Sequence, residues 1–336
     1  MSPDRVETDV DGTRVTVSNL DKVLYPEAGF TKGQVLDYYA RVADVMLPHV
    51  RDRPATFKRY PNGVEGKAFF QKHAPDPRPD WVTTLEVPST SDPAVSVEFV
   101  VVQDRATLVW AANLATLEFH VPLWHTRKGK EPPGAPDHMV FDLDPGPGTS
   151  IVECCQVARW IGDALGDDNV LAKTSGSKGL QLYVPLKRAQ WDATNERAHE
   201  LARSLESGHP DAVVSIMRKA LRPGKVLVDW SQNSPSKTTV AAYSLRALAT
   251  PTVSTPVTWD EIEACRRSGD PGDLRFDVTD VLDRLEKFGD LMADLVRPPA
   301  ATRVTAQKSS PGRPRHPKEG RDVPQQHHRP EAGSST

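Results

Sequence analysis

The sequence predicts a mixed α/β protein in which β-sheets are flanked by helices. Short apolar stretches that end at Gly or Pro, such as residues 139–146, are typical of strands. Longer stretches with apolar residues at helical spacing follow Ser or Thr caps, as at residues 31–47 and 150–165. The two kinds alternate along a chain of 336 residues, which is long enough for one large domain or two ordinary ones.

The composition excludes several classes of protein. The formal net charge is -3 at pH 7, so nucleic-acid binding would need local basic patches rather than a basic overall field. Cys154, Cys155 and Cys265 are too few, and wrongly spaced, for a zinc site or a disulfide framework. No apolar run reaches the roughly 18 residues of a membrane span, and the first residues lack a signal-peptide pattern. We therefore expect a cytoplasmic protein with no membrane partner.

The N-terminal part combines a hairpin with a helix that begins among lysines. Residues 6–17 alternate around an Asp-Gly pair, a strong hairpin signal. Thr and Gln at capping-box spacing open the helix predicted at residues 31–47. Free amides at its start, together with Asn19, Lys22 and Lys32, would form a phosphate pocket. Solvated lysines beside a helix cap are the alternative.

Basic and aromatic residues interleave in the next stretch, residues 51–72, which contains Lys58 and Phe70. This composition suits a nucleic-acid groove, where cations follow phosphates and rings stack on bases. The alternative is that the phenylalanines belong to the core. His120 lies in the apolar stretch at residues 114–124, and a lone histidine there is more often a core residue than a catalyst.

Asp142 and Asp144 alternate with apolar residues and then meet Pro145-Gly146. On a strand, residues i and i+2 share one face, so both carboxylates would point the same way while Phe141 and Leu143 hold the strand in a core. Neighbouring carboxylates repel each other unless a divalent cation neutralises them. A solvated strand end that enters a turn is the alternative.

The later elements follow the same rules. The pattern predicts strands at 95–102, 170–173, 180–185 and 226–230, a strand or helix start at 107–111, and helices at 194–206, 260–276 and 278–295. A polar loop between two of these strands carries Ser175 and Lys178. Its amides and ammonium group could surround phosphates, although the spacing is not that of a Walker A loop.

Asp229 ends the strand at 226–230 and is a natural third carboxylate. Three carboxylates allow two metal ions to lie together, the arrangement used for in-line phosphoryl displacement. Lys237 and Arg246 add cations nearby in sequence, although each alone could be a surface charge. From residue 297 onward, eight Lys or Arg stand against three Asp or Glu among Pro, Ser, Gly and Gln. We expect this tail to be disordered, with a weak, salt-sensitive attraction to nucleic acid.

Motifs in this order resemble the polymerase domain of bacterial DNA ligase D, in the archaeo-eukaryotic primase superfamily. They are N-L-D-K-V-L-Y-P, R-P-A-T-F-K-R-Y-P-N-G, F-D-L-D-P-G, T-S-G-S-K-G-L, and V-D-W-S-Q-N with K-T-T-V. The resemblance covers about residues 6–295. It implies a primase-type core with mixed sheets flanked by helices. It also implies a stand-alone polymerase that adds nucleotides, preferably ribonucleotides and with manganese, to broken DNA ends in non-homologous end joining.

The resemblance further implies roles for individual residues. Two divalent metal ions, Mn or Mg, would bind the catalytic carboxylates Asp142, Asp144 and Asp229. The 5′-phosphate of the downstream strand would meet Asn19, Lys22 and Lys32, and the template would meet Lys58 and Phe70. The incoming nucleotide and its triphosphate would be handled by His120, Ser175, Lys178, Lys237 and Arg246.

One position departs from the family pattern. The family loop usually continues G-L-H, with the histidine reaching the triphosphate, whereas this chain has Gln181. Glutamine can donate a neutral hydrogen bond but cannot carry charge. The loss of one charge-assisted contact would cost on the order of 1.5–3 kcal/mol and slow catalysis about tenfold to a hundredfold or more.

We therefore expect three parts. Residues 1–135 would form an N-terminal portion with the 5′-phosphate and template contacts, residues 136–295 the catalytic core, and residues 296–336 a disordered basic tail. The expected partners are double-stranded DNA ends or gaps, nucleoside triphosphates, Ku and a separate ATP-dependent DNA ligase, because the sequence contains no ligase or phosphoesterase module. We expect a nucleoid-associated location.

Two other functions remain as alternatives at this stage. The first is a DNA-end-binding or bridging protein whose catalysis is weak or lost, and Gln181 is its motivation. The second is a metal-dependent phosphoesterase, which no histidine-rich metal cluster supports.

Overall fold

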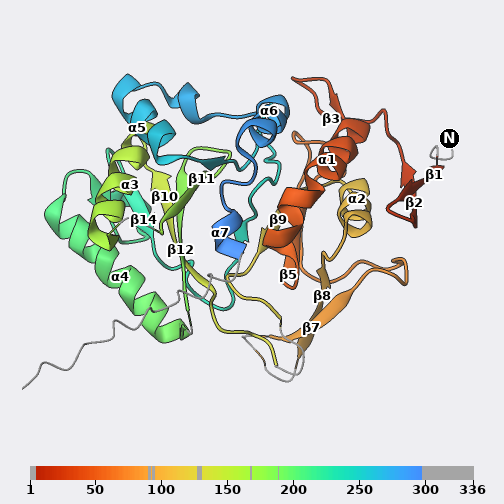
Figure 1. Ribbon diagram of the computed structural model, residues 1–336, viewed down its shortest axis with the longest axis horizontal. Helices are drawn as coiled ribbons and strands as arrows, with labels where there is room; N and C mark the ends of the chain where they lie inside the picture. The colour runs from red at the N-terminus through yellow and green to blue at the C-terminus, as the bar shows by residue number, and fades with distance from the viewer. Residues whose placement is uncertain are drawn as a thin grey trace, which may run out of the picture. The chain divides into compact units, whose positions relative to one another are not determined.

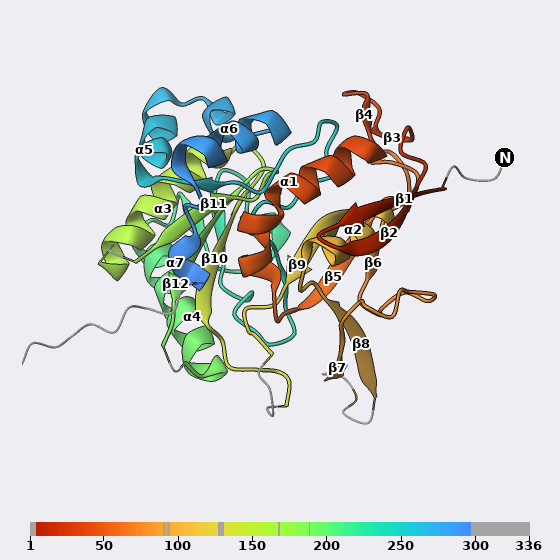
Figure 2. The same cartoon turned by 45° about the vertical axis from the view of Figure 1, so that its right-hand side comes forward.

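Two six-stranded β-sheets form the centre of the structure, and helices pack against each of them (Figure 1, Figure 2). The computed structural model describes residues 5–89, 92, 95–126, 131–166, 169–187 and 189–296. Two short hairpins near the N-terminus lie outside these sheets. The predicted mixed α/β class, with sheets flanked by helices, is confirmed.

The first sheet, which we call the β10 sheet, has the strand order β13–β14–β10–β12–β11–β16 and is antiparallel except between β13 and β14. Its strands are β10 (His138–Pro145), β11 (Leu171–Thr174), β12 (Leu180–Pro185), β13 (Val213–Val214), β14 (Val226–Asp229) and β16 (Pro256–Val257). The helices α3 (Ile151–Leu165), α4 (Trp191–Gly208) and α5 (Trp259–Ser268) lie on its side of the molecule (Figure 1). Phe141 and Leu143 are fully buried in the apolar cluster that this sheet shares with them, as predicted.

The second sheet, which we call the β9 sheet, has the order β15–β9–β5–β8–β7, and β6 pairs with β5. Its strands are β5 (Pro54–Arg59), β6 (Phe69–Gln71), β7 (Thr84–Pro88), β8 (Ser96–Val101), β9 (Thr116–Val121) and β15 (Thr239–Val240). The helices α1 (Lys32–Val50) and α2 (Arg105–Asn113) pack against each other, and α2 packs on β9. Since β15 follows β14 in the chain, the polypeptide returns from the first sheet to complete the second.

The two N-terminal hairpins place the lysines of the predicted phosphate pocket. The first pairs β1 (Arg5–Val10) with β2 (Thr13–Ser18), and the second pairs β3 (Val23–Tyr25) with β4 (Phe30–Thr31). Asp11 and Gly12 both have positive φ, 50° and 82°, as a tight two-residue hairpin turn requires. The predicted hairpin is therefore confirmed.

Both capping boxes read from the sequence are present. The Thr31 hydroxyl accepts from the backbone N–H of Gln34, whose side chain accepts from Thr31 in return, and α1 begins there. Ser150 and Glu153 form the same reciprocal pair at the start of α3. The residues that set these helix starts are local, which is why the sequence located them correctly.

Residues 107–111, predicted as a strand or a helix start, belong to the helix α2. Two predicted helices were wrong in extent. The helix predicted at 260–276 ends at Ser268, because Gly269 takes a left-handed conformation with φ 73°. Pro271 then begins the 3₁₀ turn η2 (Pro271–Leu274). The helix predicted at 278–295 is split at Gly289 into α6 (Val278–Phe288) and α7 (Ala293–Val296). One more 3₁₀ turn, η1 (Lys219–Leu221), precedes β14.

The interior contains two apolar clusters. One joins the N-terminal elements to Val140, Tyr183 and residues 241–253, and the other lies between the β10 sheet and its helices. A boundary near residue 135 stays a prediction. Val140 and Tyr183 lie on strands of the β10 sheet, but their side chains belong to the apolar cluster of the N-terminal elements. The predicted tail, apart from residue 296, lies outside the described residues.

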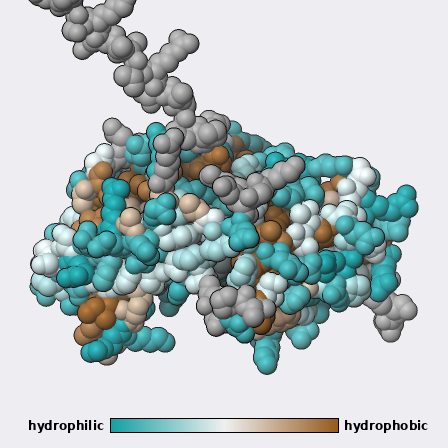
Figure 3. All heavy atoms as spheres, turned by 90° about the horizontal axis from the view of Figure 1, so that it is seen from below, coloured by the Kyte–Doolittle hydropathy of each residue, from teal (hydrophilic) through white to brown (hydrophobic). Residues whose placement is uncertain are grey.

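The face in Figure 3 is mostly hydrophilic, with hydrophobic areas that are small and separated. Among the residues that the structure describes, no helix combines the length and the apolar character needed to cross a lipid bilayer.

Candidate active site

The register of the β10 sheet aligns four polar side chains across four neighbouring strands. Asp142 on β10 lies opposite Asp229 on β14, and on its other side opposite Gln181 on β12. Gln181 in turn lies opposite Lys173 on β11. Because residues that pair across antiparallel strands project to the same face, Asp229, Asp142, Gln181 and Lys173 form one row, which we call the acidic row.

The acidic row faces the second sheet. Val140 lies two residues before Asp142 on β10 and therefore shares its face. Val140 is fully buried in the apolar cluster that also contains Phe119 and Val121 of β9. Asp144, two residues after Asp142, lies on the same face at the exposed end of the strand. The three predicted carboxylates are thus brought to one place, between the two sheets.

These carboxylates repel one another. Burial, the charge of Asp144 and the charge of Asp229 raise the pKa of Asp142 to about 7, against a smaller opposing effect of a hydrogen bond from Gln181. Burial and the charge of Asp229 also raise the pKa of Asp144. Carboxylates that are difficult to ionise together have the chemistry of a divalent-cation site, because a bound cation would offset the repulsion.

The carboxylates do not yet surround a common point. Both oxygens of Asp229 accept hydrogen bonds, one from Ser231 (N–H at 2.9 Å, hydroxyl at 2.7 Å) and one from the Gln232 amide at 2.9 Å. Over the described ranges, no three His, Cys, Asp or Glu side chains are arranged as a closed ligand set. The hard oxygen donors are of the kind that Mg²⁺ and Mn²⁺ prefer.

Asn233 secures the strand that carries Asp142. Its side-chain oxygen accepts from the Val140 N–H at 2.9 Å, and its amide donates to the Val140 carbonyl at 2.7 Å. The β10–β14 ladder ends at the pair Asp142 and Asp229, so Asn233 replaces the missing strand partner at the next position of β10. The V-D-W-S-Q-N motif therefore has two roles. It supplies the carboxylate of Asp229, and four residues later Asn233 holds β10, the neighbouring strand, in register.

The β9 sheet carries a second group of side chains, Lys58, Phe70, Glu118 and His120, which we call the basic row. Lys58 on β5 lies opposite Glu118 on β9 and, on its other side, opposite Phe70 on β6. His120 is two residues from Glu118 and shares its face, and its ring meets the Phe70 ring edge-on at 5.7 Å between centroids. Phe70 is 60% exposed, so its outer face is free to stack on a base. The predicted template residues and His120 thus lie together.

Glu118 holds the basic row in place, and no sequence motif identified it as a site residue. This carboxylate is 2% exposed. One oxygen accepts from the Lys58 ammonium and the Tyr60 hydroxyl, both at 3.2 Å. The other lies 3.0 Å from Nε2 of His120. Burial lowers the pKa of His120, so at pH 7 the ring is neutral, and Nε2–H donates to Glu118 while Nδ1 is left as an acceptor.

Arg246 links the two rows. Its Nε lies 3.4 Å from the Glu118 carboxylate, and its guanidinium also donates to the carbonyl of Ser175 in the loop after β11. Gly176 is required beside it: its φ is 67°, and a Cβ there would lie 2.7 Å from Cγ of Arg246. The positive charge of Arg246 contributes to the lowered pKa of Glu118 and opposes the rise in the pKa of Asp144. The guanidinium is therefore positioned between the acidic row and the basic row.

The loop with Ser175 and Lys178 differs from the prediction in one respect. The expected free amides are occupied: the Ser175 hydroxyl accepts from the N–H groups of Ser177 and Gly179, at 3.2 Å and 3.1 Å. Lys178 is exposed and lines a hollow of about 330 Å³ beside Pro145 and the start of α3. Phosphate contacts in this loop would therefore come from the ammonium group rather than from the amides.

Lys237 projects from the segment between β14 and β15 and is exposed. It lies eight positions after Asp229, in the part of the chain that passes from the acidic row to the β9 sheet. Of the five residues expected near the triphosphate, His120, Ser175 and Arg246 are joined by contacts through Glu118 and Arg246. Lys178 and Lys237 are exposed.

The residues predicted to hold a 5′-phosphate flank the second hairpin. The Lys32 ammonium donates to the carbonyl of Ser18 at 2.6 Å, next to Asn19, and the Lys32 N–H donates to the carbonyl of Lys22 at 2.8 Å. Burial and the nearby charges of Lys22 and Arg59 lower the pKa of Lys32 to about 8. A group of cations that repel one another favours an anion.

The prediction of free amides at the start of α1 was wrong. The N–H groups of Lys32 and Gly33 donate to the carbonyls of Lys22 and Leu20, both at 2.8 Å, and the N–H of Gln34 donates to Thr31. The turn before the helix folds back on its first residues and uses these donors. A phosphate would therefore be held by Lys22, Lys32 and the Asn19 side chain.

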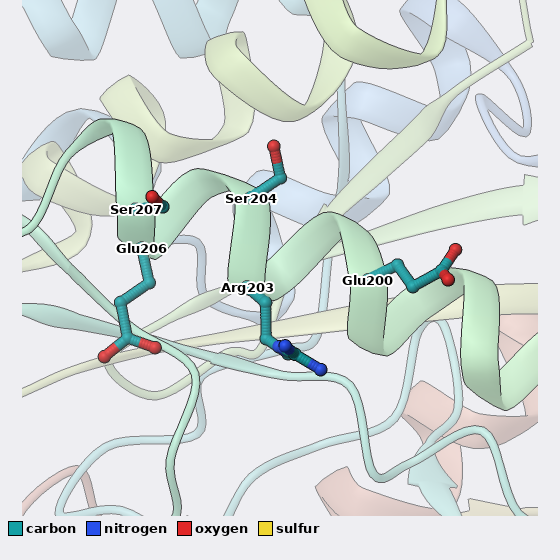
Figure 4. Close-up of a pocket in the computed structure, with 5 residues that line it drawn as sticks. All are labelled: Glu200, Arg203, Ser204, Glu206 and Ser207. Atoms are coloured by element: carbon teal, nitrogen blue, oxygen red, sulfur yellow. The ribbon is translucent and has the colours of Figure 1, made fainter.

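A larger hollow, of about 570 Å³, lies away from both rows. Its lining is Glu200, Arg203, Ser204, Glu206 and Ser207, all from α4 (Figure 4). The side chains are of mixed charge and come from one helix. Glu206 accepts from the Ser215 hydroxyl and N–H, so it has a structural role. We assign no function to this hollow.

Comparison with known proteins identifies the family. The sequence pattern described as "LigD, primase-polymerase domain" matches residues 31–292. The multifunctional non-homologous end joining protein LigD of Mycolicibacterium smegmatis is 43% identical over 302 residues, covering 88% of this chain and 38% of that protein. The bifunctional LigD of Bacillus subtilis is 30% identical over 290 residues, covering 85% of this chain and 45% of its own length.

A solved structure agrees with this relationship. The polymerase domain from Mycobacterium tuberculosis ligase D, in complex with DNA, is similar with a TM-score of 0.78 and 43% identity, covering 84% of this chain and 98% of that domain. This chain spans less than half the length of the LigD proteins it matches, and the matched part is their polymerase domain. The chain therefore belongs to the LigD primase-polymerase family, whose members are nucleotidyltransferases of non-homologous end joining.

Proposed function

We propose that this chain adds nucleotides, preferably ribonucleotides, to 3′-hydroxyl ends at breaks and gaps in DNA. The observation that carries the proposal is the alignment of Asp142 with Asp229 across one pair of strands, with Asp144 on the same face. Carboxylates placed in this way on adjacent strands, facing a basic row, suit the transfer of a nucleotidyl group between two polyanionic substrates.

Asp142, Asp144 and Asp229 would hold two divalent cations. When bound, such ions would lower the pKa of the primer 3′-hydroxyl and offset the charge that develops on the leaving pyrophosphate. The chain's own cations would neutralise the rest of the triphosphate. Arg246 is the best placed of them, because Glu118 and the Ser175 carbonyl fix its guanidinium on two sides.

The basic row would receive the template strand beside the nucleotide. Phe70 offers an exposed ring for stacking, and Lys58 lies 5.5 Å from its centroid with a charge that can meet a phosphate. Because the rings of Phe70 and His120 meet edge-on, a template base stacked on Phe70 would lie close to a nucleotide bound at His120. Lys22, Lys32 and Asn19 would hold the 5′-phosphate on the far side of a gap. The DNA complex of the M. tuberculosis domain supports DNA as the partner.

The remaining parts of the proposal concern the cellular setting. A polymerase of broken ends needs an end-binding protein and a ligase, and we propose Ku and an ATP-dependent DNA ligase in these roles, supported by the end-joining relatives. We also propose that the chain works on the chromosome in the cytoplasm. An end-binding protein without catalysis is the competing function, since Gln181 replaces a charged residue of the family pattern.

The test uses the purified protein with Mn²⁺, ribonucleotides and a 5′-phosphorylated gapped duplex, and follows primer length. Asp142→Asn removes one carboxylate and keeps its shape. Nucleotide addition should be lost while the melting temperature is unchanged or higher, because repulsion within the acidic row is relieved. Asp163→Asn, an exposed residue paired with Arg159 on α3, is the matched control and should behave as the parent does. Addition that persists in Asp142→Asn would refute the assignment, and wild-type protein that binds the duplex without extending it would favour the end-binding function.

A further inference from the structure

Lys173 is a buried lysine that the proposed reaction does not yet use. It is 1% exposed and lies at the end of the acidic row, two strands from Asp142. Lysine is rarely buried so completely, because removing an ammonium group from water is costly unless it is paired. Its partners here are neutral: Nζ donates to Gln181 Oε1 at 2.5 Å and to the Ser254 hydroxyl at 2.7 Å.

The ammonium group is held firmly. The Ser254 hydroxyl that accepts from Lys173 donates onward to the carbonyl of Thr174 at 2.9 Å. The ring of Tyr183 lies 5.6 Å from Nζ, within the range of a cation–π contact. With two hydrogen bonds and one aromatic face around it, Lys173 has little freedom to turn away from Gln181.

These contacts decide which end of the Gln181 amide faces Asp142. The atom of Gln181 beside Nζ is its oxygen, as expected for an ammonium group, which has donors and no acceptor. The Tyr183 hydroxyl donates to the same oxygen at 3.2 Å. Both acceptor positions of Oε1 are then filled. The amide nitrogen is left for the opposite side, where the register places Asp142 and where its N–H can donate to that carboxylate.

Without Lys173 the amide could adopt either orientation. In the reversed orientation Oε1 would face the Asp142 carboxylate, and two acceptors would meet. In the observed orientation one N–H supports Asp142 and the second is available to the site. Burial lowers the pKa of Lys173 to about 7, so the orientation of Gln181 rests on the hydrogen bonds of Lys173 rather than on a full positive charge.

We propose that Lys173 is a positioning residue for nucleotide addition, which fixes Gln181 as a hydrogen-bond donor toward Asp142 and the triphosphate. The proposal rests on the proposed function and explains how glutamine serves at a position where the family usually has histidine. An imidazole donates a hydrogen bond from its own ring, so the need for Lys173 should disappear when residue 181 is histidine.

The experiment compares wild-type protein, Lys173→Met, Gln181→His and the double variant in single-nucleotide addition to the gapped duplex. Lys173→Met should add nucleotides about tenfold or more slowly at saturating ribonucleotide, with duplex affinity unchanged. In the Gln181→His background the same replacement should change the rate less than about threefold. Lys287→Met, on the exposed face of α6, is the control and should have no effect in either background. Equal slowing in both backgrounds, or an unaffected Lys173→Met rate, would overturn the proposal.

Two further measurements keep the test decisive. Gln181→Glu retains the acceptor for Lys173 but removes the donor toward Asp142. Nucleotide addition should therefore be lost in this variant, and the result is informative even if Lys173→Met fails to fold. A normal rate would count against the proposal.

The second measurement follows the Gln181 side-chain amide by ¹⁵N NMR, with its resonances assigned by their absence in Gln181→His. Lys173→Met should shift and speed the exchange of its protons, and unchanged resonances would refute the positioning role. If wild-type protein adds no nucleotides, the proposed function fails, whereas this NMR result still decides the role of Lys173.

Discussion

Replacing Glu118 by Gln tests whether one buried charge organises the basic row. Burial raises the pKa of this carboxyl, but the hydrogen bond from His120 and the charges of Arg246, His120 and Lys58 outweigh burial and lower the pKa from 4.5 to about 2. At about 1.36 kcal/mol per pKa unit, these contacts stabilise the folded protein by about 3 kcal/mol. Since His120 is neutral at pH 7, most of the charge effect comes from Arg246 and Lys58.

The sign of the pH dependence follows from the direction of this shift. Because folding lowers the pKa of Glu118, its stabilisation is complete above about pH 4.5 and is lost as the pH falls toward 2. The wild-type protein should exceed Glu118→Gln by about 3 kcal/mol at pH 7 and by about 1.4 kcal/mol at pH 3. At pH 7 the melting temperature should fall by about 6–12 °C.

Urea unfolding between pH 3 and pH 7 measures this difference, and primer extension at pH 7 measures its effect on the site. Nucleotide addition should fall at least about tenfold, because His120 and Arg246 lose the group that aligns them. Glu200→Gln, exposed on α4, is the matched control and should change neither quantity. A melting temperature within about 2 °C of wild type, or a stability difference that stays constant from pH 7 to pH 3, would refute the reasoning.

The remaining predictions concern DNA. Lys32→Met should reduce the preference for a 5′-phosphorylated over a 5′-hydroxyl duplex by about 10–100-fold, since a charge-assisted contact is worth about 1.5–3 kcal/mol. Binding titrations with both duplexes measure this preference, and an unchanged value would exclude Lys32 from the pocket. In wild-type protein this preference should weaken as the pH rises through about 8, where the Lys32 ammonium loses its proton. Phe70→Ala should weaken template binding by about 1–3 kcal/mol with little change in melting temperature, whereas Phe288→Ala, 40% exposed on α6, should leave binding intact; equal effects of the two would contradict base stacking on Phe70.

Local signals in the sequence predicted much of the fold. Capping boxes located the starts of α1 and α3, and an Asp-Gly pair located the first hairpin. The two helices predicted too long are those in which the helical pattern of the sequence continues past the glycine that ends the helix. Gly269 and Gly289 end α5 and α6 inside apolar patterns that read as continuous, because a single glycine within such a pattern is compatible with either outcome.

The site was predictable by residue type but not by pairing. Alternation placed Asp142 and Asp144 on one face, but no local rule states that β14 and β12 flank β10, with Asp229 and Gln181 in register with Asp142. Glu118 and Lys173 were missed for a related reason. Each is a single charged residue within an apolar strand, and its function depends on neighbours that only the folded sheet supplies.

The free amides expected at α1 and in the Ser175 loop show the opposite error. A helix start or a glycine-rich loop has donors in every sequence, yet backbone and hydroxyl acceptors nearby had already taken those of Lys32, Gly33 and Gly179. Unused donors can be counted only when the competing acceptors are known. Phosphate binding at either place would therefore depend on ammonium groups, and we expect it to fall steeply with salt.

The register of β10 joins the stability of the fold to the integrity of the site. A slip of one residue along β10 would turn Phe141 and Leu143 toward the second sheet and bury Asp142 beneath α3, since successive side chains face opposite ways. The apolar cluster under the sheet thus opposes the repulsion among the carboxylates on its other face. Substitutions that loosen this packing should damage stability and nucleotide addition together. Asp142→Asn removes charge and leaves the register unchanged, so it should separate the two properties.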